Sequence, residues 1–227
     1  MVQNRPEGNG PSAEPAPVLN TEGTTMGEDG RFPMNGFPST DAYDFSFAWI
    51  TDTQYYAQNF PENFQGMNEW IVENSEQIKT KYLIHTGDIV NQYNKQFQWE
   101  EADAAMQILD DAGLPYGVLA GNHDVQDGRE WYDQYYKYFG EDRYAGRDYY
   151  GGSYENNKGH YDLISESGQD FIILYMSWDT FEDEADWMNQ VLDQYSDRKA
   201  ILCFHRFINK DGKLDQTGEY MLEEVVS

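Results

Sequence analysis

The stretch YGVLAGNHD, residues 116–124, joins a short apolar run directly to a polar peptide. Its first part, 116–120, has the length and apolar character of a buried β-strand. The polar peptide Gly-Asn-His-Asp begins where that strand would end. In open α/β sheets, ligands bind beyond the carboxyl ends of the strands. The stretch therefore predicts a strand that delivers an amide, an imidazole and a carboxylate to one edge of a sheet.

Two earlier stretches repeat this arrangement of an apolar run and a polar peptide. Asp52 opens the peptide Asp-Thr-Gln after the run 45–51, and Asp88 closes the peptide Gly-Asp after the run 82–86. Asp88 lies 36 residues after Asp52 and 34 residues before Asn122. Both intervals are about the size of a βαβ unit, so the polar peptides are expected at the same edge of a parallel sheet.

Helical segments are expected between these strands, after a loop at residues 54–63. Apolar residues recur there at three- and four-residue spacing, and they are Met67, Trp70, Ile71, Ile78, Trp99, Ala102, Met106 and Leu109. The first strand is nearly continuous in apolar character, which predicts a strand covered on both faces. The first half of the domain is thus predicted to be βαβαβ.

The second half has a different pattern. Aromatic residues at helical spacing over 131–139 favour core packing over a substrate-lining cluster. A loop rich in Gly, Tyr and Asn is expected at 143–158. Two strands, 160–165 and 170–177, are separated by Glu-Ser-Gly, which predicts an antiparallel hairpin.

The remaining segments predict a helix from 179 or 180 to about 195, a strand at 200–204 and a final helix from near Thr217. The fold class is therefore α/β, with a βαβαβ half, an antiparallel hairpin and helices outside the sheets. Residues 1–42 are rich in proline and glycine, which predicts a flexible linker or arm before a domain of residues 43–227.

Charge and cysteine content narrow the class of protein. The formal net charge is −26, so the surface repels nucleic-acid backbones and anionic membranes, and non-specific nucleic-acid binding is not expected. Cys203 is the single cysteine, which permits no internal disulfide. No apolar run is long enough to span a membrane, and the N-terminus lacks the basic and apolar segments of a signal peptide.

Candidate functional residues follow four of the predicted strands: Asp52, Asp88, Asn122 with His123, and His205. Taken singly, an aspartate in such a place is typical of a turn or a helix cap, and a lone histidine is typical of a packed residue. Together, two carboxylates, the amide oxygens of Gln54 and Asn122, and an imidazole at one sheet edge suit divalent metals and phosphate chemistry.

On these motifs the chain resembles the calcineurin-like metallophosphoesterases. That family's pattern is Asp-x-His, Gly-Asp, Gly-Asn-His-Asp/Glu, a further His and finally Gly-His-x-His, and the resemblance covers residues 45–205. It implies an α/β/β/α layered fold and two divalent metal ions, drawn from Mn, Fe, Zn and Mg. It also implies hydrolysis of a phosphomonoester or phosphodiester by a water activated between the metals.

The resemblance also implies roles for single residues. Asp52 would bind the first metal, with Gln54 at the position of the family's first-motif histidine. Asp88 would bridge both metals, and Asn122 and His205 would bind the second.

Two further residues would act in catalysis without binding metal. His123 would stabilise the transition state and protonate the leaving oxygen, and Asp124 would orient its ring.

The chain departs from the family pattern in two places. Gln54 replaces a histidine, and an amide oxygen is a weaker ligand that disfavours soft metals. The peptide Asp-Thr-Gln resembles that of a bacterial, often exported subgroup, which implies an extracellular or cell-surface location. Gly-His-x-His is absent, and the sequence ends 22 residues after His205, which predicts a C-terminally truncated member without the final strands. A second class of function therefore stays open, a non-catalytic binding module on a degenerate or truncated phosphoesterase fold.

Overall fold

The computed structural model describes residues 40–125, 131–178 and 180–226. The chain divides into two units, Met1–Ala42 and Tyr43–Ser227, and the strands and α-helices lie in the second. The predicted linker lies outside the described residues except for a single 3-10 turn, Thr40–Ala42. Among the helices that the structure describes, none combines the length and the apolar character needed to cross a membrane.

The first sheet and its helices confirm the predicted βαβαβ order. Its three strands are parallel, in the order β1-β2-β3, and they are β1 (Ser46–Ile50), β2 (Thr80–His85) and β3 (Tyr116–Val118). The helices of this half are α1 (Gln54–Asn59), α2 (Pro61–Asn74), α3 (Gln96–Ala112) and α4 (Asp133–Phe139). All three strands have their carboxyl ends at the same edge of the sheet, as the polar peptides predicted.

The second sheet has the order β4-β5-β6-β7 and contains the predicted hairpin. Its strands are β4 (Tyr150–Tyr154), β5 (Gly159–Glu166), β6 (Gln169–Met176) and β7 (Lys199–Phe204). β7 lies parallel to β6, and His205, directly after β7, lies 2.8 Å from the carbonyl oxygen of Thr86, directly after β2, so β7 ends beside the carboxyl ends of the first sheet. Helices α5 (Glu182–Gln194) and α6 (Gln216–Met221), followed by a π-helical turn, Leu222–Val226, complete this half.

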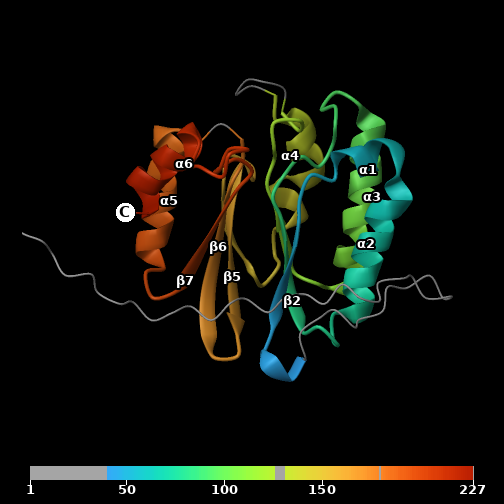
Figure 1. Ribbon diagram of the computed structural model, residues 1–227, viewed down its shortest axis with the longest axis horizontal. Helices are drawn as coiled ribbons and strands as arrows, with labels where there is room; N and C mark the ends of the chain where they lie inside the picture. The colour runs from blue at the N-terminus through green and yellow to red at the C-terminus, as the bar shows by residue number, and fades with distance from the viewer. Residues whose placement is uncertain (1–39, 126–130, 179, 227) are drawn as a thin grey trace, which may run out of the picture. The chain divides into compact units, whose positions relative to one another are not determined.

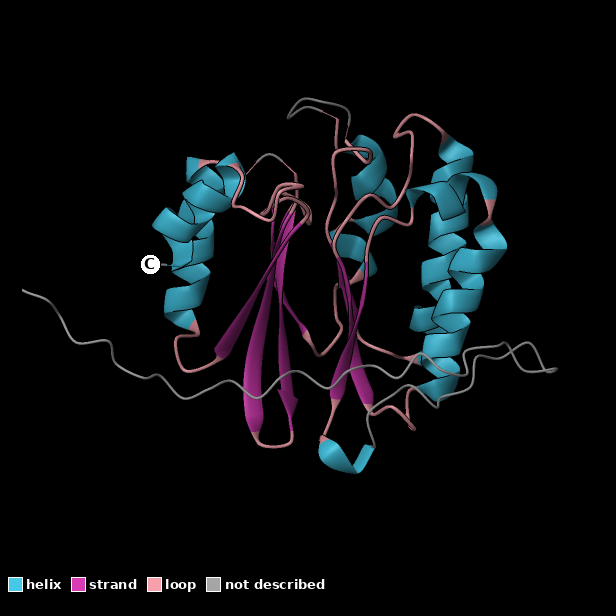
Figure 2. Cartoon of the chain, in the orientation of Figure 1, coloured by secondary structure: helices cyan, strands magenta, loops and turns pink. Residues whose placement is uncertain are grey.

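The two sheets lie face to face with helices on both outer sides (Figures 1 and 2). One apolar cluster packs the first sheet against its helices and includes Trp99 and Leu109. A second cluster lies between the sheets around Tyr82 and Tyr175, and a third joins the second sheet to α5 through Met188. The layering is therefore α/β/β/α, as predicted.

Three local predictions were wrong. Trp49 is 72% exposed because β1 is an edge strand, so β1 is not covered on both faces. The expected loop at 54–63 is mostly helical, because Pro61 starts α2 directly after α1 ends. The expected loop at 143–158 contains β4, where a β-carbon at Gly151 would lie 2.1 Å from the Tyr161 ring. Glycine at 151 thus admits the cross-strand tyrosine, and its low strand propensity hides the strand in the sequence.

A buried polar cluster links the two sheets. The Tyr82 hydroxyl on β2 donates to the Asp162 carboxylate on β5, and the Tyr175 hydroxyl donates to Tyr82 Oη at 3.0 Å. His160 stacks on Tyr175 at 4.3 Å, and burial lowers its pKa to about 3. Burial also raises the pKa of Asp162 far above its ordinary value. The interface between the sheets therefore contains groups that resist becoming charged.

Candidate metal centre

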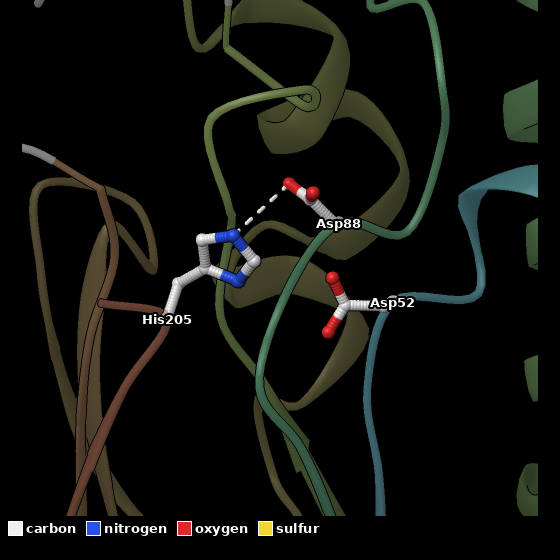
Figure 3. Close-up of side chains that lie close together, drawn as sticks. All are labelled: Asp52, Asp88 and His205. Atoms are coloured by element: carbon white, nitrogen blue, oxygen red, sulfur yellow. Dashed lines mark ion pairs between the residues drawn. The ribbon is translucent and has the colours of Figure 1, made fainter. Parts of the chain in front are cut away.

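Three candidate ligands from three different strands meet at the carboxyl edge of the sheets. Asp52 follows β1, Asp88 follows β2 and His205 follows β7, and their ligand atoms lie within 4.8 Å of one another. Figure 3 shows the His205 ring directed at Asp88, with the Asp52 carboxylate beside them. The fold thus brings together three predicted ligands that are far apart along the chain.

Backbone strain accompanies both aspartates. Asp52 and Asp88 have φ angles of 54° and 53°, in the left-handed region that non-glycine residues rarely adopt. The backbone N–H of Asp52 donates to the carbonyl of Gly87 at 3.0 Å, which fixes the two loops to each other. Such conformations cost roughly 1–3 kcal/mol each and persist where the surrounding structure holds them, often at functional sites.

Two glycines, Gly87 and Gly121, allow the loop after β2 and the loop after β3 to touch. A β-carbon at Gly121 would lie 2.3 Å from Asp88 Oδ1, and one at Gly87 would lie 2.6 Å from the backbone nitrogen of Gly121. The backbone N–H of His123 also donates to Asp88 Oδ1 at 3.0 Å. The glycines of the Gly-Asp and Gly-Asn-His-Asp peptides are therefore required by close approach between the loops.

The hydrogen bonds of His205 leave an acceptor atom facing the cluster. His205 Nδ1 lies 2.8 Å from the carbonyl oxygen of Thr86, and because a carbonyl only accepts, Nδ1 carries the proton. In the neutral ring Nε2 is then an acceptor, and it lies 3.1 Å from Asn122 Oδ1 and 3.3 Å from Asp88 Oδ1. Three acceptors that face one another repel unless a proton or a cation lies among them, so this geometry fits a divalent cation.

The side chain of Gln54 gives a second indication that this cluster fits a cation. Its Nε2 donates to Asp88 Oδ2 at 3.2 Å, while Oε1 is buried and has no hydrogen-bond partner among the described residues. A buried polar atom without a partner costs free energy. Rotation of the amide would exchange its oxygen and nitrogen and place an oxygen ligand beside Asp88. The residues present therefore fit a bound cation at this position.

Burial dominates the electrostatics of Asp88, whose residue is only 3% exposed. Desolvation raises the pKa of its carboxyl, and the nearby His205 acts in the opposite direction. A carboxylate buried without a neutralising charge is costly, and a bound cation would offset this cost.

His123 lies beside the cluster with its ring fixed from one side. Its Nδ1 lies 2.9 Å from the carbonyl oxygen of Asn91, so Nδ1 carries a proton. Its Nε2 lies 4.0 Å from Asp88 Oδ2, and the side chain is 37% exposed. The ring thus presents Nε2 to a molecule approaching the candidate ligands from solvent, which is the geometry that a general acid requires.

The predicted contact between Asp124 and the His123 ring is not found. The fully buried Asp124 carboxylate instead accepts from the backbone N–H groups of Gly121, Ile89 and Val90 at 2.8, 3.1 and 2.8 Å. Burial raises the pKa of Asp124 to about 8, while these three donors act in the opposite direction. Asp124 therefore links the backbone of the loop after β2 to the backbone of the loop after β3. Its side chain is buried, whereas the side chain of His123 is partly exposed.

Sequence reasoning missed the residues that act through main-chain atoms. The carbonyls of Thr86 and Asn91 set the ring orientations of His205 and His123, and any residue type could supply a carbonyl. Below the site, Gly87 N–H donates to His85 Nδ1, so Nε2 donates to Thr53. These bonds fix the loops that carry the candidate ligands.

Comparison with known proteins gives a consistent family and fold. The profile of the calcineurin-like phosphoesterase family matches residues 45–226. A dimetal phosphatase from Danio rerio superposes with a TM-score of 0.51 at 12% identity, covering 80% of this chain and 77% of that one. Purple acid phosphatase PPD1 from yellow lupin seeds superposes with a TM-score of 0.50 at 15% identity, covering 75% of this chain and 33% of that one. At these identities the superpositions show a shared fold.

A bacterial relative is more similar in sequence. The uncharacterized protein YvnB of Bacillus subtilis strain 168 is 48% identical over 189 residues, which is 83% of this chain and 14% of YvnB. The chain thus spans a small part of the length of this relative.

Proposed function

The chain belongs to the calcineurin-like phosphoesterase family, and from this membership we propose that it hydrolyses a phosphomonoester or phosphodiester with two divalent metal ions. The observation that carries the proposal is that two acceptors face His205 Nε2, Asn122 Oδ1 at 3.1 Å and Asp88 Oδ1 at 3.3 Å. Such a set suits a cation, and cations at such a site serve phosphate chemistry.

The proposed ligands divide into two groups that share Asp88. Asp52, Gln54 and Asp88 would hold one metal, and Asp88, Asn122 and His205 would hold the other. Divalent cations, when bound, activate water as a nucleophile and offset the negative charge of the phosphoryl oxygens. With an amide in each group, oxygen-preferring metals such as Mn²⁺ and Mg²⁺ are favoured over softer ones.

His123 is the proposed general acid. Asn91 holds its ring through Nδ1, so an imidazolium would donate from Nε2, the atom that faces Asp88 and solvent. That proton would pass to the leaving oxygen of the ester as its bond to phosphorus breaks.

An apolar groove of about 540 Å³ beside the cluster offers room for the leaving group. It is lined by Trp49 and Phe207 and reaches Asp52 and His205. Aromatic walls next to a phosphate site favour esters with an apolar or aryl leaving group.

The test is hydrolysis of bis(4-nitrophenyl) phosphate and 4-nitrophenyl phosphate with added Mn²⁺, compared with the same protein after chelation. Turnover is expected only with metal and should be lost in Asp88→Asn, while Asp170→Asn, the same change at an exposed hairpin position, should retain it. Metal binding without turnover of either ester would favour the non-catalytic binding module instead.

A further inference from the structure

Trp178 touches the candidate ligand His205 directly. Its indole meets the imidazole edge-on, with ring centroids 5.8 Å apart and an interplanar angle of 64°. The guanidinium of Arg206 lies 5.4 Å from the indole centre, and Arg206 in turn is paired with Asp215. The indole is therefore held by a cation–π contact as well as by its packing against the imidazole.

The backbone of Trp178 is tied to the loop that carries Asn122. Its N–H donates to the carbonyl of Ala120 at 2.9 Å, and the Ala120 N–H donates to Ser177 Oγ at 2.9 Å. On the far side, the Tyr132 hydroxyl donates to the Trp178 carbonyl at 2.7 Å. Two hydrogen bonds thus fix the segment after β6 against Ala120, which precedes the Gly-Asn-His-Asp peptide, and a third fixes it to Tyr132.

These contacts connect two candidate ligands that come from different sheets. Asn122 follows β3 of the first sheet, and His205 follows β7 of the second. Trp178, at the end of β6, contacts the loop of the first through its backbone and the ring of the second through its side chain. Trp178 therefore links the segment that precedes Asn122 to the ring of His205.

We propose that Trp178 is a positioning residue for the metal centre, which holds His205 at the correct distance from Asn122 to share one cation. The proposal rests on the proposed function, because it requires that these residues bind metal. Groups that orient metal ligands from behind typically change metal affinity by about 10–100-fold when they are removed. A role limited to fold stability would change unfolding but leave the affinity of the folded protein unaltered.

The experiment is calorimetric titration of Mn²⁺ into wild type, Trp178→Ala, Trp178→Leu and Trp178→Phe, each shown to be folded by circular dichroism. Trp187→Ala is the matched control, because Trp187 packs on Tyr154 and Tyr161 in the second sheet, away from the ligands. The Ala and Leu variants should bind Mn²⁺ about 10–100-fold more weakly, and Phe, which keeps a ring against His205, should recover most of the affinity. Trp187→Ala should bind as wild type does.

Equal Mn²⁺ affinity in wild type and the folded Leu variant would overturn the positioning role while leaving the metal centre intact. Absence of binding in wild type would overturn the proposed function and this inference together. If the Ala variant does not fold, the comparison of Leu with Phe still decides the question. Before metal is added, the ¹⁵N signals of the His205 ring give a second readout, and they should shift from the wild-type positions in Leu more than in Phe.

Discussion

A β-carbon at Gly121 would lie 2.3 Å from Asp88 Oδ1 and 2.5 Å from the Asp88 backbone nitrogen. Gly121→Ala should therefore push apart the loops that carry Asp88 and Asn122. We expect a loss of roughly 1–3 kcal/mol in the free energy of unfolding, the usual cost of overpacking, and weaker Mn²⁺ binding. Urea unfolding and calorimetry measure the two effects. Gly66→Ala is the control, since Gly66 lies in α2 with open space around it and alanine there should be neutral or stabilising.

His123→Ala should lower kcat by about 10²–10⁴-fold, the usual range for loss of a general acid. Because no proposed metal ligand is removed, the metal content of the purified protein should not change. Elemental analysis and steady-state kinetics on an aryl phosphodiester measure both quantities. A large loss of metal, or an unchanged kcat, would contradict the assigned role.

Gln54→His should change the metal preference of the site. An imidazole in place of the buried amide adds a softer ligand, so affinity for Zn²⁺ relative to Mg²⁺ should rise, on the order of tenfold. Competition titrations measure this ratio. Gln107→His, on the exposed face of α3, should leave it unaltered, and an equal ratio in the two variants would mean that Gln54 does not bind metal.

The buried Asp162 should make stability depend on pH. Burial raises the pKa of its carboxyl in the folded chain, so the folded state keeps a proton that the unfolded state releases near pH 4. Its contribution to stability is therefore lost as pH rises above that point. Asp162→Asn should gain stability relative to wild type between pH 5 and pH 8, by up to about 1.4 kcal/mol per pH unit.

Urea unfolding across this pH range measures the difference. Asp170→Asn, in the same hairpin but exposed, is the control, and its free energy of unfolding should change with pH as that of wild type does. A parallel curve for Asp162→Asn as well would mean that Asp162 is ionised in the folded protein.

The neutral His160 makes the free energy of unfolding depend on pH in the opposite direction. Its pKa is lowered to about 3 by burial, so its contribution is complete above pH 6.5 and is lost as pH falls towards 3. His160→Gln should therefore lose less stability than wild type between pH 6 and pH 4, which the same unfolding series detects. Equal losses in both proteins would contradict the burial of a neutral ring.

The fold could be predicted where apolar runs and polar peptides alternate. β2 and β3 were found because Gly-Asp and Gly-Asn-His-Asp mark their ends. β4 was missed because Gly151 and Gly152 have low strand propensity, and only the Tyr161 ring on the neighbouring strand explains them. Contacts with the neighbouring strand stabilise β4, and the local sequence alone does not indicate a strand there.

The candidate site could be predicted where side chains define it. Asp52, Asp88 and His205 do converge, as their places after strands indicated. The partner of the His123 ring was not predictable, because it is the carbonyl of Asn91, a backbone atom from a loop 32 residues earlier. Trp178 was likewise hidden, since nothing in the sequence relates the end of β6 to His205.

The most direct test of the metal centre is calorimetric titration of Mn²⁺ into residues 1–227 and into Asp88→Asn. Asp88 lies in both proposed ligand groups, and its two oxygens contact Gln54, His123 and His205. We predict saturable Mn²⁺ binding to the wild-type chain and loss of that binding in Asp88→Asn. No binding to wild type, or equal binding to both proteins, would contradict the assignment of this cluster as a metal centre.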